Sequence, residues 1–450
     1  MQIIITGAGL VGTSLAEQLL KENHDVALVE QDPVRADNAG EKLDALMITG
    51  SGSNPIDLER AGIAEADMLI AATPVDEVNV LGCMIARHYD VPRRIARIRK
   101  WNFENLDARI TPEGLGITQV IYPEESTIQA VLNYVETPFA IDAQDFQKRS
   151  ILLRSYLVTE EMPIANRSLI ELRESSEAKI LVVAIIRGDE VFIPKGEDCV
   201  LPGDKPLFIF PREALPVFLE LVNAAHVPKK KAIVFGDTLT ALNIAKALQQ
   251  EVDTVVFIDP DLDHGKIVAE QLHDVDVLLG HGADVDVLRE ANIRFADYFV
   301  AAATATHENV LSCLLAKSEG AKDVISIVNE DQYVGLILSI GINNVINPRQ
   351  LTAASILSTI NPAYVGPSLH IQKTDIDVIR FKVREGTPVA GKALMEGWKK
   401  ARGIAIVGAI LRHDEMIIPT GTTVLQPDDL VIVFTRSAGI PKLRKLFGTD

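Results

Sequence analysis

The sequence predicts an α/β fold class, with two parallel-sheet domains that are each followed by a small α+β domain. The chain repeats itself: Gly7 and Gly236 open matching stretches at an offset of 229 residues, and Asn79 and Asn309 match at an offset of 230. In each copy, short apolar strands alternate with helical patterns, which is typical of parallel sheets. A glycine turn joins the first strand to the first helix. The near-constant offset indicates a duplicated pair of domains.

The first predicted domain covers residues 1–132 and opens with the strand Gln2–Thr6. A helix with an apolar stripe follows the glycine turn, because leucines recur there at helical spacing. A second helix, over Pro123–Val135, leads out of the domain. Between these helices, apolar runs predict strands at Val26–Glu30, Ala45–Thr49, Met68–Thr73, Ile95–Ile98 and Gln119–Ile121.

The second predicted domain, residues 140–225, has a β-rich pattern. Strand-like segments alternate with turn signals such as Pro202-Gly203-Asp204, and one short helix lies near Ser168–Glu174. The second half of the chain repeats both domains, over residues 230–358 and 368–450. The strands predicted in the first small domain are Ser150–Val158, Ile180–Ile186, Val191–Ile193 and Lys205–Phe210.

Composition narrows the function classes. The formal net charge of -18 argues against a nucleic-acid partner, which requires a basic face. No apolar run approaches the ~20 residues that cross a bilayer. The chain begins directly with a strand, so we expect no signal peptide. Cys83 and Cys313 hold equivalent positions in apolar helical stretches, and we expect them to be small buried hydrophobes. A cytoplasmic protein fits these features.

The stretch Gly7-Ala8-Gly9-Leu10-Val11-Gly12 follows a strand and opens a helix, as in a Rossmann-like dinucleotide-binding domain. Gly7 allows the tight turn, Gly9 lets main-chain amides approach a pyrophosphate, and Gly12 permits close packing of the helix on the strand. The helix N-terminus adds free N–H groups and a partial positive charge. Alone the motif is weak, but its position between strand and helix predicts a nucleotide site.

Other candidate residues lie at strand ends in the same domain. Glu30 ends the second strand, where an acid accepts hydrogen bonds from ribose hydroxyls and disfavours a 2′-phosphate, so NAD(H) is expected rather than NADP(H). Thr73 ends the fourth strand, at the sheet edge where ligands bind. Arg97 and Arg99 on the fifth strand project the same way, and one of them could reach a phosphate. The loop at Gly50-Ser51-Gly52-Ser53 could pass under the adenine or ribose.

The second copy of the glycine loop has changed. In Gly236-Asp237-Thr238-Leu239-Thr240-Ala241 only the first glycine remains, and Asp237 adds a negative charge. Asp259 keeps the acid, but no arginine occupies the stretch that parallels the fifth strand. We therefore expect no tight pyrophosphate binding in this copy.

The sequence lacks the signatures of several enzyme classes. It has no metal-ligand spacing, no G-x-S-x-G elbow and no Gly-Lys-Ser/Thr phosphate loop. The small domains offer no histidine paired with an arginine or acid, as a hydride-transfer site requires. We therefore predict neither a catalytic residue nor a metal site.

These motifs together resemble the tandem RCK (regulator of K+ conductance) family. The resemblance rests on IIITGAGLVGTSLAEQL, on the strand ending in Glu30, on GSGSNPIDLERAGIAEADMLIAATPVDEVN and on RIARIR at Arg94–Arg99, and it covers essentially the whole chain. It implies RCK N- and C-terminal domains in tandem, each pair present twice. It also implies binding of NAD(H), with ATP or ADP as further ligands. The site residues carried over are Gly7 to Val11 at the pyrophosphate, Glu30 at the ribose, Thr73 and Pro74 beside the nicotinamide or phosphates, and Arg97 at the phosphates.

The resemblance further implies a regulatory subunit without catalytic activity. Such a protein forms a ring of RCK domains in a homo-oligomer beneath a potassium-translocating membrane subunit, at the inner face of the cell membrane. Two alternatives stay open. One is an NAD-dependent oxidoreductase with a duplicated chain, and the other is a scaffold with a vestigial site.

Overall fold

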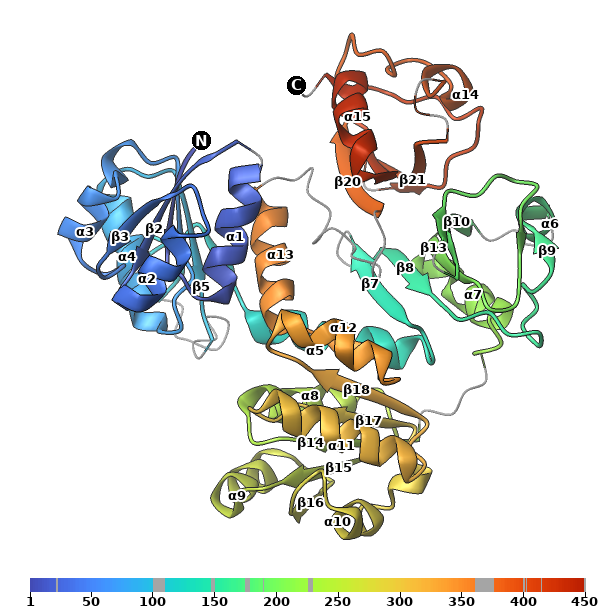
Figure 1. Cartoon of the computed structure of the whole chain (residues 1–450), viewed down its shortest axis with the longest axis horizontal. Helices are drawn as coiled ribbons and strands as arrows, with labels where there is room; N and C mark the ends of the chain where they lie inside the picture. The colour runs from blue at the N-terminus through green and yellow to red at the C-terminus, as the bar shows by residue number, and fades with distance from the viewer. Residues whose placement is uncertain are drawn as a thin grey trace. The chain divides into compact units, whose positions relative to one another are not determined.

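The computed structural model describes residues 1–21, 23–99, 110–146, 150–174, 179–188, 190–225, 230–360, 376–399, 401, 403–413 and 415–448 (Figure 1). The chain divides into two compact units. Unit 1 contains Met1–Thr127 and helix α13 (Pro348–Ile360); unit 2 contains Ile128–Asn347 and the C-terminal segment. The start predicted for the fourth domain, residue 368, lies outside the described residues.

The sheet of unit 1 is parallel, with strand order β3-β2-β1-β4-β5-β6. The order reverses between β1 and β4, the position at which open α/β sheets form a ligand crevice at the carboxyl ends of their strands. The elements of the unit, besides α13, are β1 (Gln2–Thr6), α1 (Leu10–Lys21), β2 (Asp25–Glu30), α2 (Pro33–Gly40), β3 (Leu46–Thr49), α3 (Pro55–Arg60), η1 (Ile63–Glu65), β4 (Met68–Ala71), α4 (Asp76–His88), β5 (Arg93–Arg97), β6 (Gln119–Ile121) and the first turn of α5 (Pro123–Glu136).

Apolar residues on both faces of this sheet form the core, as expected for parallel strands covered by helices. Ile3, Ile4 and Ile5 are all buried, and the helices pack onto them through residues such as Leu15 of α1. Cys83 of α4 is fully buried, and burial raises the pKa of its thiol to about 12. The prediction that this cysteine acts as a small hydrophobe is confirmed.

Helix α13 follows the last strand of the second parallel sheet in the sequence, yet it packs against α1 and β6 of unit 1 (Figure 1). The guanidinium of Arg93 on β5 donates to the main-chain oxygens of Thr359 at 2.7 Å and Ile360 at 3.2 Å. Gln119 of β6 donates to the hydroxyl of Thr359 at 2.8 Å. These bonds satisfy main-chain oxygens that the end of a helix leaves without partners inside the helix.

Unit 2 contains a second parallel sheet of matching topology, with strand order β16-β15-β14-β17-β18-β19. In the part of unit 2 that the structure describes, residues 128–136 of α5 pack on this sheet, where the hydroxyl of Tyr298 donates to the main-chain oxygen of Val135 at 3.2 Å. The elements are β14 (Lys231–Phe235), α8 (Leu239–Leu248), β15 (Thr254–Asp259), α9 (Leu262–Gln271), β16 (Val275–Leu279), α10 (Val285–Glu290), η4 (Ile293–Phe295), β17 (Tyr298–Ala301), α11 (Thr306–Ser318), β18 (Asp323–Ile327), α12 (Asp331–Ser339) and β19 (Asn344–Ile346).

The two small domains have antiparallel sheets, of order β11-β10-β13-β8-β7 and β20-β23-β21-β22. Their elements are β7 (Asp142–Phe146), β8 (Ile151–Ser155), β9 (Arg167–Ser168), α6 (Leu169–Glu174), β10 (Leu181–Arg187), β11 (Glu190–Phe192), β12 (Cys199–Val200), β13 (Lys205–Pro211), η3 (Arg212–Ala214), α7 (Leu215–Leu221), β20 (Ile376–Lys382), α14 (Leu394–Gly397), β21 (Ala405–Arg412), β22 (Glu415–Ile417), β23 (Leu430–Arg436), η5 (Ser437–Gly439) and α15 (Ile440–Phe447).

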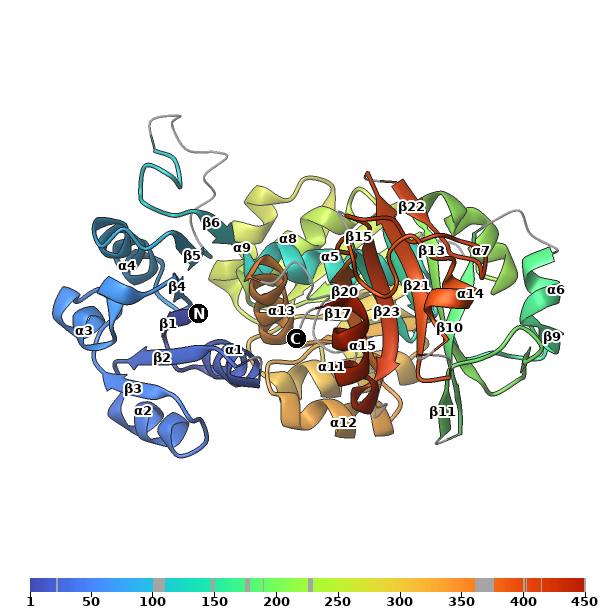
Figure 2. The ribbon, with the colours of Figure 1, turned by 90° about the horizontal axis from the view of Figure 1, so that it is seen from above.

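The sheets of the two small domains lie against each other through β10 and β21 (Figure 2). Buried residues from both sheets, including Leu153, Val183, Ala409 and Phe434, form one hydrophobic core. Arg436 of the second small domain donates to the main-chain oxygen of Val191 in the first. In unit 2 the duplicated small domains therefore pack as a pair.

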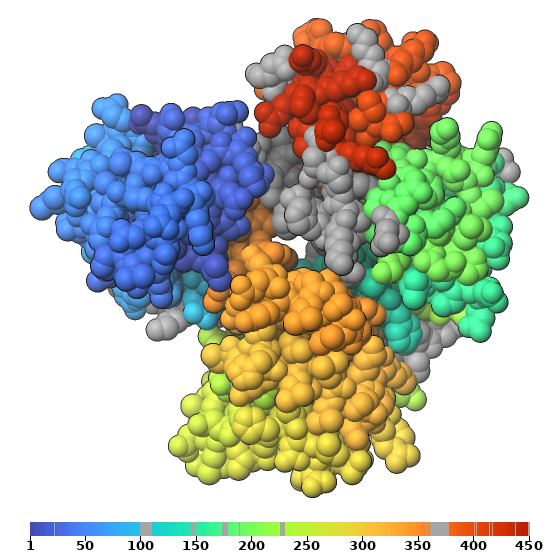
Figure 3. All heavy atoms as spheres, viewed as in Figure 1, coloured from blue at the N-terminus to red at the C-terminus, as the bar shows by residue number. Residues whose placement is uncertain are grey.

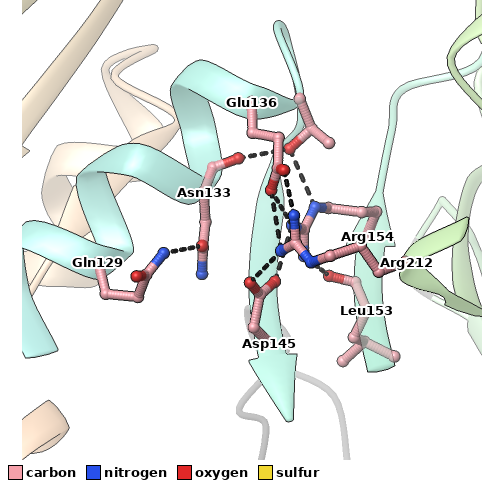
Figure 4. A network of polar contacts seen from close by, with 8 residues as sticks. Gln129, Asn133, Glu136, Asp145, Leu153, Arg154 and Arg212 are labelled. Atoms are coloured by element: carbon pink, nitrogen blue, oxygen red, sulfur yellow. Dashed lines mark hydrogen bonds and ion pairs between the residues drawn. The ribbon is translucent and has the colours of Figure 1, made fainter. Parts of the chain in front are cut away.

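A buried ion-pair network joins the end of α5 to the first small domain (Figure 4). The side chain of Arg154 on β8 is fully buried and donates to Asp145 on β7 at 2.8 Å and to the hydroxyl of Thr137 at 3.0 Å. Arg212 bonds the other oxygen of Asp145 at 2.9 Å and also pairs with Glu136. Because a buried ion pair needs well-oriented partners, this network fixes how the helix enters the small domain.

The predicted fold class is confirmed, since both parallel sheets and both small antiparallel sheets are present in the predicted order. Figure 3 shows the same face as Figure 1 with all heavy atoms as spheres, and the blue atoms of the N-terminal segment of unit 1 form one group in it. No helix among the described residues is both long and apolar enough to span a membrane.

Candidate functional site

The glycine loop of unit 1 lies at the carboxyl end of β1, beside the reversal of strand order. Gly7 adopts φ +96°, a left-handed conformation that side chains rarely adopt. Its N–H donates to the main-chain oxygen of Val29 at 2.8 Å. A Cβ at Gly7 would stand 3.1 Å from Cα of Thr73. The loop is therefore pressed against the end of β4.

Gly9 and Gly12 have opposite surroundings. A Cβ added at Gly12 would stand 1.8 Å from the main-chain oxygen of Gly7, so helix α1 approaches the loop too closely for any side chain. Apart from its two chain neighbours, no atom of the described residues lies within 4 Å of a Cβ added at Gly9. The space in front of Gly9 is open, as a pyrophosphate cradle requires. Leu10 is exposed beside it, whereas Ala8 and Val11 are buried beneath.

The carboxylate of Glu30 lies beneath the loop and is 8% exposed. One oxygen accepts the N–H of Ala8 at 2.6 Å, and the other accepts the N–H of Asp32 at 3.0 Å. Each oxygen keeps further lone-pair capacity, which a ribose hydroxyl could use. The sequence did not predict that Glu30 also holds the glycine loop, because a main-chain partner leaves no signal in a side-chain pattern.

Thr73 lies two residues beyond the end of β4, and Pro74 beside it is exposed. Both Thr73 donors are engaged by Asn79 of α4: the amide oxygen of Asn79 accepts the N–H at 3.0 Å and the hydroxyl at 2.7 Å. The amide nitrogen of Asn79 donates to the main-chain oxygens of Thr73 at 3.0 Å and Arg97 at 2.8 Å. Fully buried Asn79 thus joins the ends of β4 and β5.

Arg97 ends β5 and is half-buried. Among the described residues, its buried Nε has no hydrogen-bond partner. Burial lowers the pKa of the guanidinium, and the charges of Arg99 and Arg349 lower it further. Glu124 and Asp76 act in the opposite direction. A cation with a buried donor left unbonded is suited to an incoming anion, since phosphate oxygens would satisfy it.

The other residues that the sequence indicated as ligand contacts are bonded to, or packed against, residues of the same domain. Arg99 pairs with Glu124 at 3.1 Å. The loop around Gly52 is packed against Thr6, because a Cβ at Gly52 would stand 2.6 Å from Cβ of Thr6. Asp57 accepts the N–H of Ser51 at 2.9 Å and holds this loop in place. Of the two arginines, Arg97 is therefore the one with a buried donor that has no bond among the described residues.

The corresponding loop in unit 2 is filled by its own side chains. The hydroxyl of Thr238 donates to the main-chain oxygen of Ala302 at 2.8 Å and accepts the N–H of Ala241 at 3.0 Å. The carboxylate of Asp237 accepts the N–H of Thr304 at 2.9 Å. An internal carboxylate thus occupies main-chain and hydroxyl donors at the edge where a phosphate would bind.

The acidic residue that ends the second strand of this copy also has hydrogen-bond partners. Asp259 is fully buried, and its carboxylate contacts Nδ1 of His264 at 2.5 Å and accepts the N–H of Asp261 at 2.9 Å. A ribose hydroxyl would have to displace the imidazole to reach it. The clamp at the strand ends persists, because Asn309 bonds both main-chain groups of Ala303 and the oxygen of Ile327.

Comparison with known protein families identifies the domains of this chain. The TrkA-N domain family matches residues 3–123 and 232–348, and the TrkA-C domain family matches residues 153–223 and 378–448. The chain belongs to the TrkA family of tandem TrkA-N and TrkA-C domains. It is 30% identical to the Trk system potassium uptake protein TrkA of Azorhizobium caulinodans over 99% of this chain and 98% of the relative. It is 29% identical to TrkA of Vibrio alginolyticus, over 96% of this chain and 95% of the relative.

Solved structures show the same fold. The GsuK channel bound to NAD aligns with a TM-score of 0.61 and 16% identity, over 100% of this chain and 79% of that chain. The structure of GsuK bound to ADP aligns with a TM-score of 0.51 and 13% identity, over 80% of this chain and 69% of that chain. At these identities the likeness concerns the fold. The predicted resemblance to tandem RCK proteins is confirmed by the family matches.

Proposed function

We propose that the protein is a regulatory subunit of a potassium transport system and binds NAD(H) or an adenine nucleotide in its first TrkA-N domain. The observation that carries the proposal is the pairing of open space at Gly9 with a buried donor of Arg97 that has no bond among the residues that the structure describes. The names of the relatives support potassium uptake as the process. The bound NAD and ADP of the structural neighbours support the ligand class.

The residues that would hold the ligand all lie at the carboxyl edge of the sheet of unit 1. Main-chain N–H groups of the loop from Gly7 to Gly12 would donate to the diphosphate. Glu30 would accept from a ribose hydroxyl while keeping its bond to the N–H of Ala8. Thr73 and Pro74 would border the nicotinamide or the further phosphates, and Arg97 would satisfy its Nε on a phosphate oxygen.

We propose a non-catalytic role, in which the ligand changes the relative stability of two arrangements of the domains. A ligand shifts such an equilibrium only by the difference between its affinities for the two states. Ligands that differ in phosphate number would make different bonds to Arg97 and so favour different arrangements. The proposed recipient is a TrkH/TrkG-like membrane subunit, contacted at the inner face of the membrane by a homo-oligomeric ring of these domains.

The second TrkA-N domain would take no nucleotide in this proposal. The N–H of Ala241 in its loop already bonds Thr238, Asp237 already bonds Thr304, and its buried acid already contacts His264. Its contribution would be structural, through the helices that pack on each sheet and through the paired small domains. The chain would thus have one ligand site for two duplicated halves.

The decisive experiment is a calorimetric titration of the full chain with NADH, NAD, ADP and ATP, repeated on Glu30→Ala and Asp259→Ala. We expect Glu30→Ala to weaken every ligand and Asp259→Ala to leave affinity unchanged. Potassium uptake by cells carrying Glu30→Ala in place of the native chain should lose its nucleotide response. Tight binding in both variants, or transport control that persists without binding, would refute the proposal.

A further inference from the structure

Two pairs of residues hold equivalent positions at the amino ends of the last two strands of each parallel sheet. Arg93 and Gln119 begin β5 and β6, and Asp323 and Asn344 begin β18 and β19. In the first copy both side chains bond the end of α13, where the cation Arg93 suits the partial negative charge of a helix C-terminus. The second copy has an acid in place of this cation.

The side chain of Asp323 projects from the face of the second sheet on which α5 packs. Asp323 is the register partner of Tyr298, and partners in adjacent parallel strands project from the same face. The hydroxyl of Tyr298 donates to the main-chain oxygen of Val135, near the C-terminal end of α5, at 3.2 Å. Asn344, the register partner of Ile325, shares this face because Ile325 lies two residues after Asp323. The acid therefore lies near a helix end whose partial negative charge disfavours a carboxylate.

Asp323 and Asn344 are joined by one hydrogen bond. The side-chain amide of Asn344 donates to Oδ1 of Asp323 at 2.7 Å. Oδ2 of Asp323 and Oδ1 of Asn344 are both buried, and among the described residues neither atom has a hydrogen-bond partner. Both atoms are acceptors when the carboxyl is ionised, so neither satisfies the other. A single proton on Oδ2 of Asp323 would donate to Oδ1 of Asn344 and satisfy both.

The surroundings of Asp323 agree with a bound proton. Burial raises the pKa of this carboxyl from 3.8 to about 6. The N–H groups of Val324 and of Phe139, which follows α5, lower the pKa only in part, as do the amide of Asn344 and the charge of Lys317 on α11.

The neighbouring titratable groups do not compete for this proton. Burial raises the pKa of four groups, and the charge of Asp323 raises each of them further: Tyr134 on α5, Tyr156 after β8, Tyr298 on β17 and Cys313 on α11. Asp297 on β17 is paired with Lys322 at 2.6 Å. Of these groups, Asp323 is the one whose charge changes near pH 6.

We propose that Asp323 and Asn344 form a proton-binding pair that controls how firmly the C-terminal part of α5 is held on the second TrkA-N domain. With the proton in place, the two side chains close on each other through two hydrogen bonds. Without it, a buried carboxylate lies near the helix end and weakens the packing. The inference does not rest on the nucleotide site. It gives the second TrkA-N domain, for which no nucleotide is proposed, a response to pH.

The direction of the response follows from linkage. Packing of α5 buries the carboxyl and favours its protonated form, so proton binding favours the packed helix in return. A rise in pKa from 3.8 to about 6 corresponds to a change of about a hundredfold in the ratio of packed to unpacked helix. This stabilisation is complete below about pH 4 and is lost as pH rises to about 6.

The test measures amide hydrogen exchange in residues 128–140 of the full chain, for the native protein and three variants at pH 7.5 and 4.5. Asp323→Asn mimics the protonated acid, because its amide donates where the acid would. Asp323→Leu removes the acid and both hydrogen bonds. Asp276→Asn is the matched control, since it makes the same change at an exposed residue of β16 in the same sheet.

At pH 7.5 we expect exchange in Asp323→Asn to be slower than in the native chain by up to about a hundredfold. At pH 4.5 the difference should fall below about tenfold, and Asp276→Asn should match the native chain at both pH values. Asp323→Leu should exchange faster than Asp323→Asn, because Asn344 loses its partner. Equal exchange in the native chain and Asp323→Asn at pH 7.5 would overturn the inference, as would equal exchange in the two variants of Asp323.

Infrared difference spectra between pH 7.5 and 5.5 give a second measurement, which does not depend on exchange. Ordinary carboxyls stay largely ionised over this range. The carbonyl stretch of protonated Asp323 should therefore appear in the native chain and in Asp276→Asn, and it should be missing from Asp323→Asn. Identical spectra of the native chain and Asp323→Asn would show that this carboxyl binds no proton there, and the inference would fail.

Discussion

The side-chain amide of Asn79 donates to the main-chain oxygen of Arg97 at 2.8 Å, across 18 positions of sequence. The same amide group bonds the N–H, the hydroxyl and the main-chain oxygen of Thr73. One buried side chain therefore sets the spacing between the two strand ends that border the proposed ligand. Asn309 makes the equivalent bonds to main-chain groups in the second TrkA-N domain, where no ligand is proposed.

Because both TrkA-N domains have this asparagine, its effect on stability can be measured apart from its effect on ligand binding. Asn79→Ala and Asn309→Ala each leave several buried main-chain groups without partners, and we expect each to lower the free energy of unfolding by about 2–4 kcal/mol. Only Asn79→Ala should also weaken ADP or NADH, because only its strand ends border the site. Denaturant unfolding and calorimetric titration of both variants check this. Equal affinity in the two variants would mean that the clamp does not position the site.

Gly9 and Gly12 give a second matched pair. Gly9→Val places its side chain in open space, so we expect native stability together with loss of nucleotide binding. Gly12→Ala places a Cβ 1.8 Å from the main-chain oxygen of Gly7, so the loop or helix α1 has to move. We expect that variant to be destabilised by about 1–3 kcal/mol, as overpacked sites are. Thermal unfolding and titration distinguish the two effects, and unchanged binding by Gly9→Val would contradict the placement of the diphosphate.

The order of strands and helices could be predicted from the sequence because apolar runs and turn signals are local. The glycine loop and Glu30 were also visible, since strand, turn and acid follow one another within 30 residues. The repeat supplied the rest of the architecture. The loss of glycines in the second loop could also be seen in the sequence. The bonds that its side chains make could not be predicted.

Contacts between residues far apart in the sequence could not be predicted, because no local sequence pattern indicates them. Arg93 and Ile360 lie 267 positions apart, and nothing in either neighbourhood indicates that α13 packs on the first domain. Asn79 was visible as a residue shared by both copies, yet its role needs the strand ends to be in place. A polar residue that recurs inside the same apolar helical stretch of each copy is the signal that could have singled it out.

We expect the stability of unit 2 to depend on pH because of the buried carboxyl of Asp323. Burial raises the pKa of this carboxyl from 3.8 to about 6, although the N–H of Val324 and the amide of Asn344 bond it and lower the pKa in part. A carboxyl that binds its proton more tightly in the folded state makes folding less favourable as pH rises from about 4 to 6. Above pH 6 the penalty is complete, on the order of 2–3 kcal/mol.

Asp323→Asn removes that penalty. We expect the variant to exceed the native chain in stability at pH 7.5 and to lose most of this advantage at pH 4.5, where the native carboxyl is largely protonated in the folded state. Urea unfolding of both chains at the two pH values measures the difference. A difference that is the same at both pH values would show that the carboxyl titrates normally.

The last prediction concerns stoichiometry. In the second loop, Thr238 bonds Ala302 and Ala241, and Asp237 bonds Thr304, so a phosphate would have to break these bonds before making its own. We expect calorimetry of the native chain to give one nucleotide per chain, and Gly9→Val to give none. Replacing Asp237 and Thr238 together by glycine should lower stability by about 1–3 kcal/mol without adding a second site, because Asp259 stays covered by His264 and no arginine stands where Arg97 stands in the first copy. Two equivalents bound by the native chain would show that the internal bonds yield to ligand.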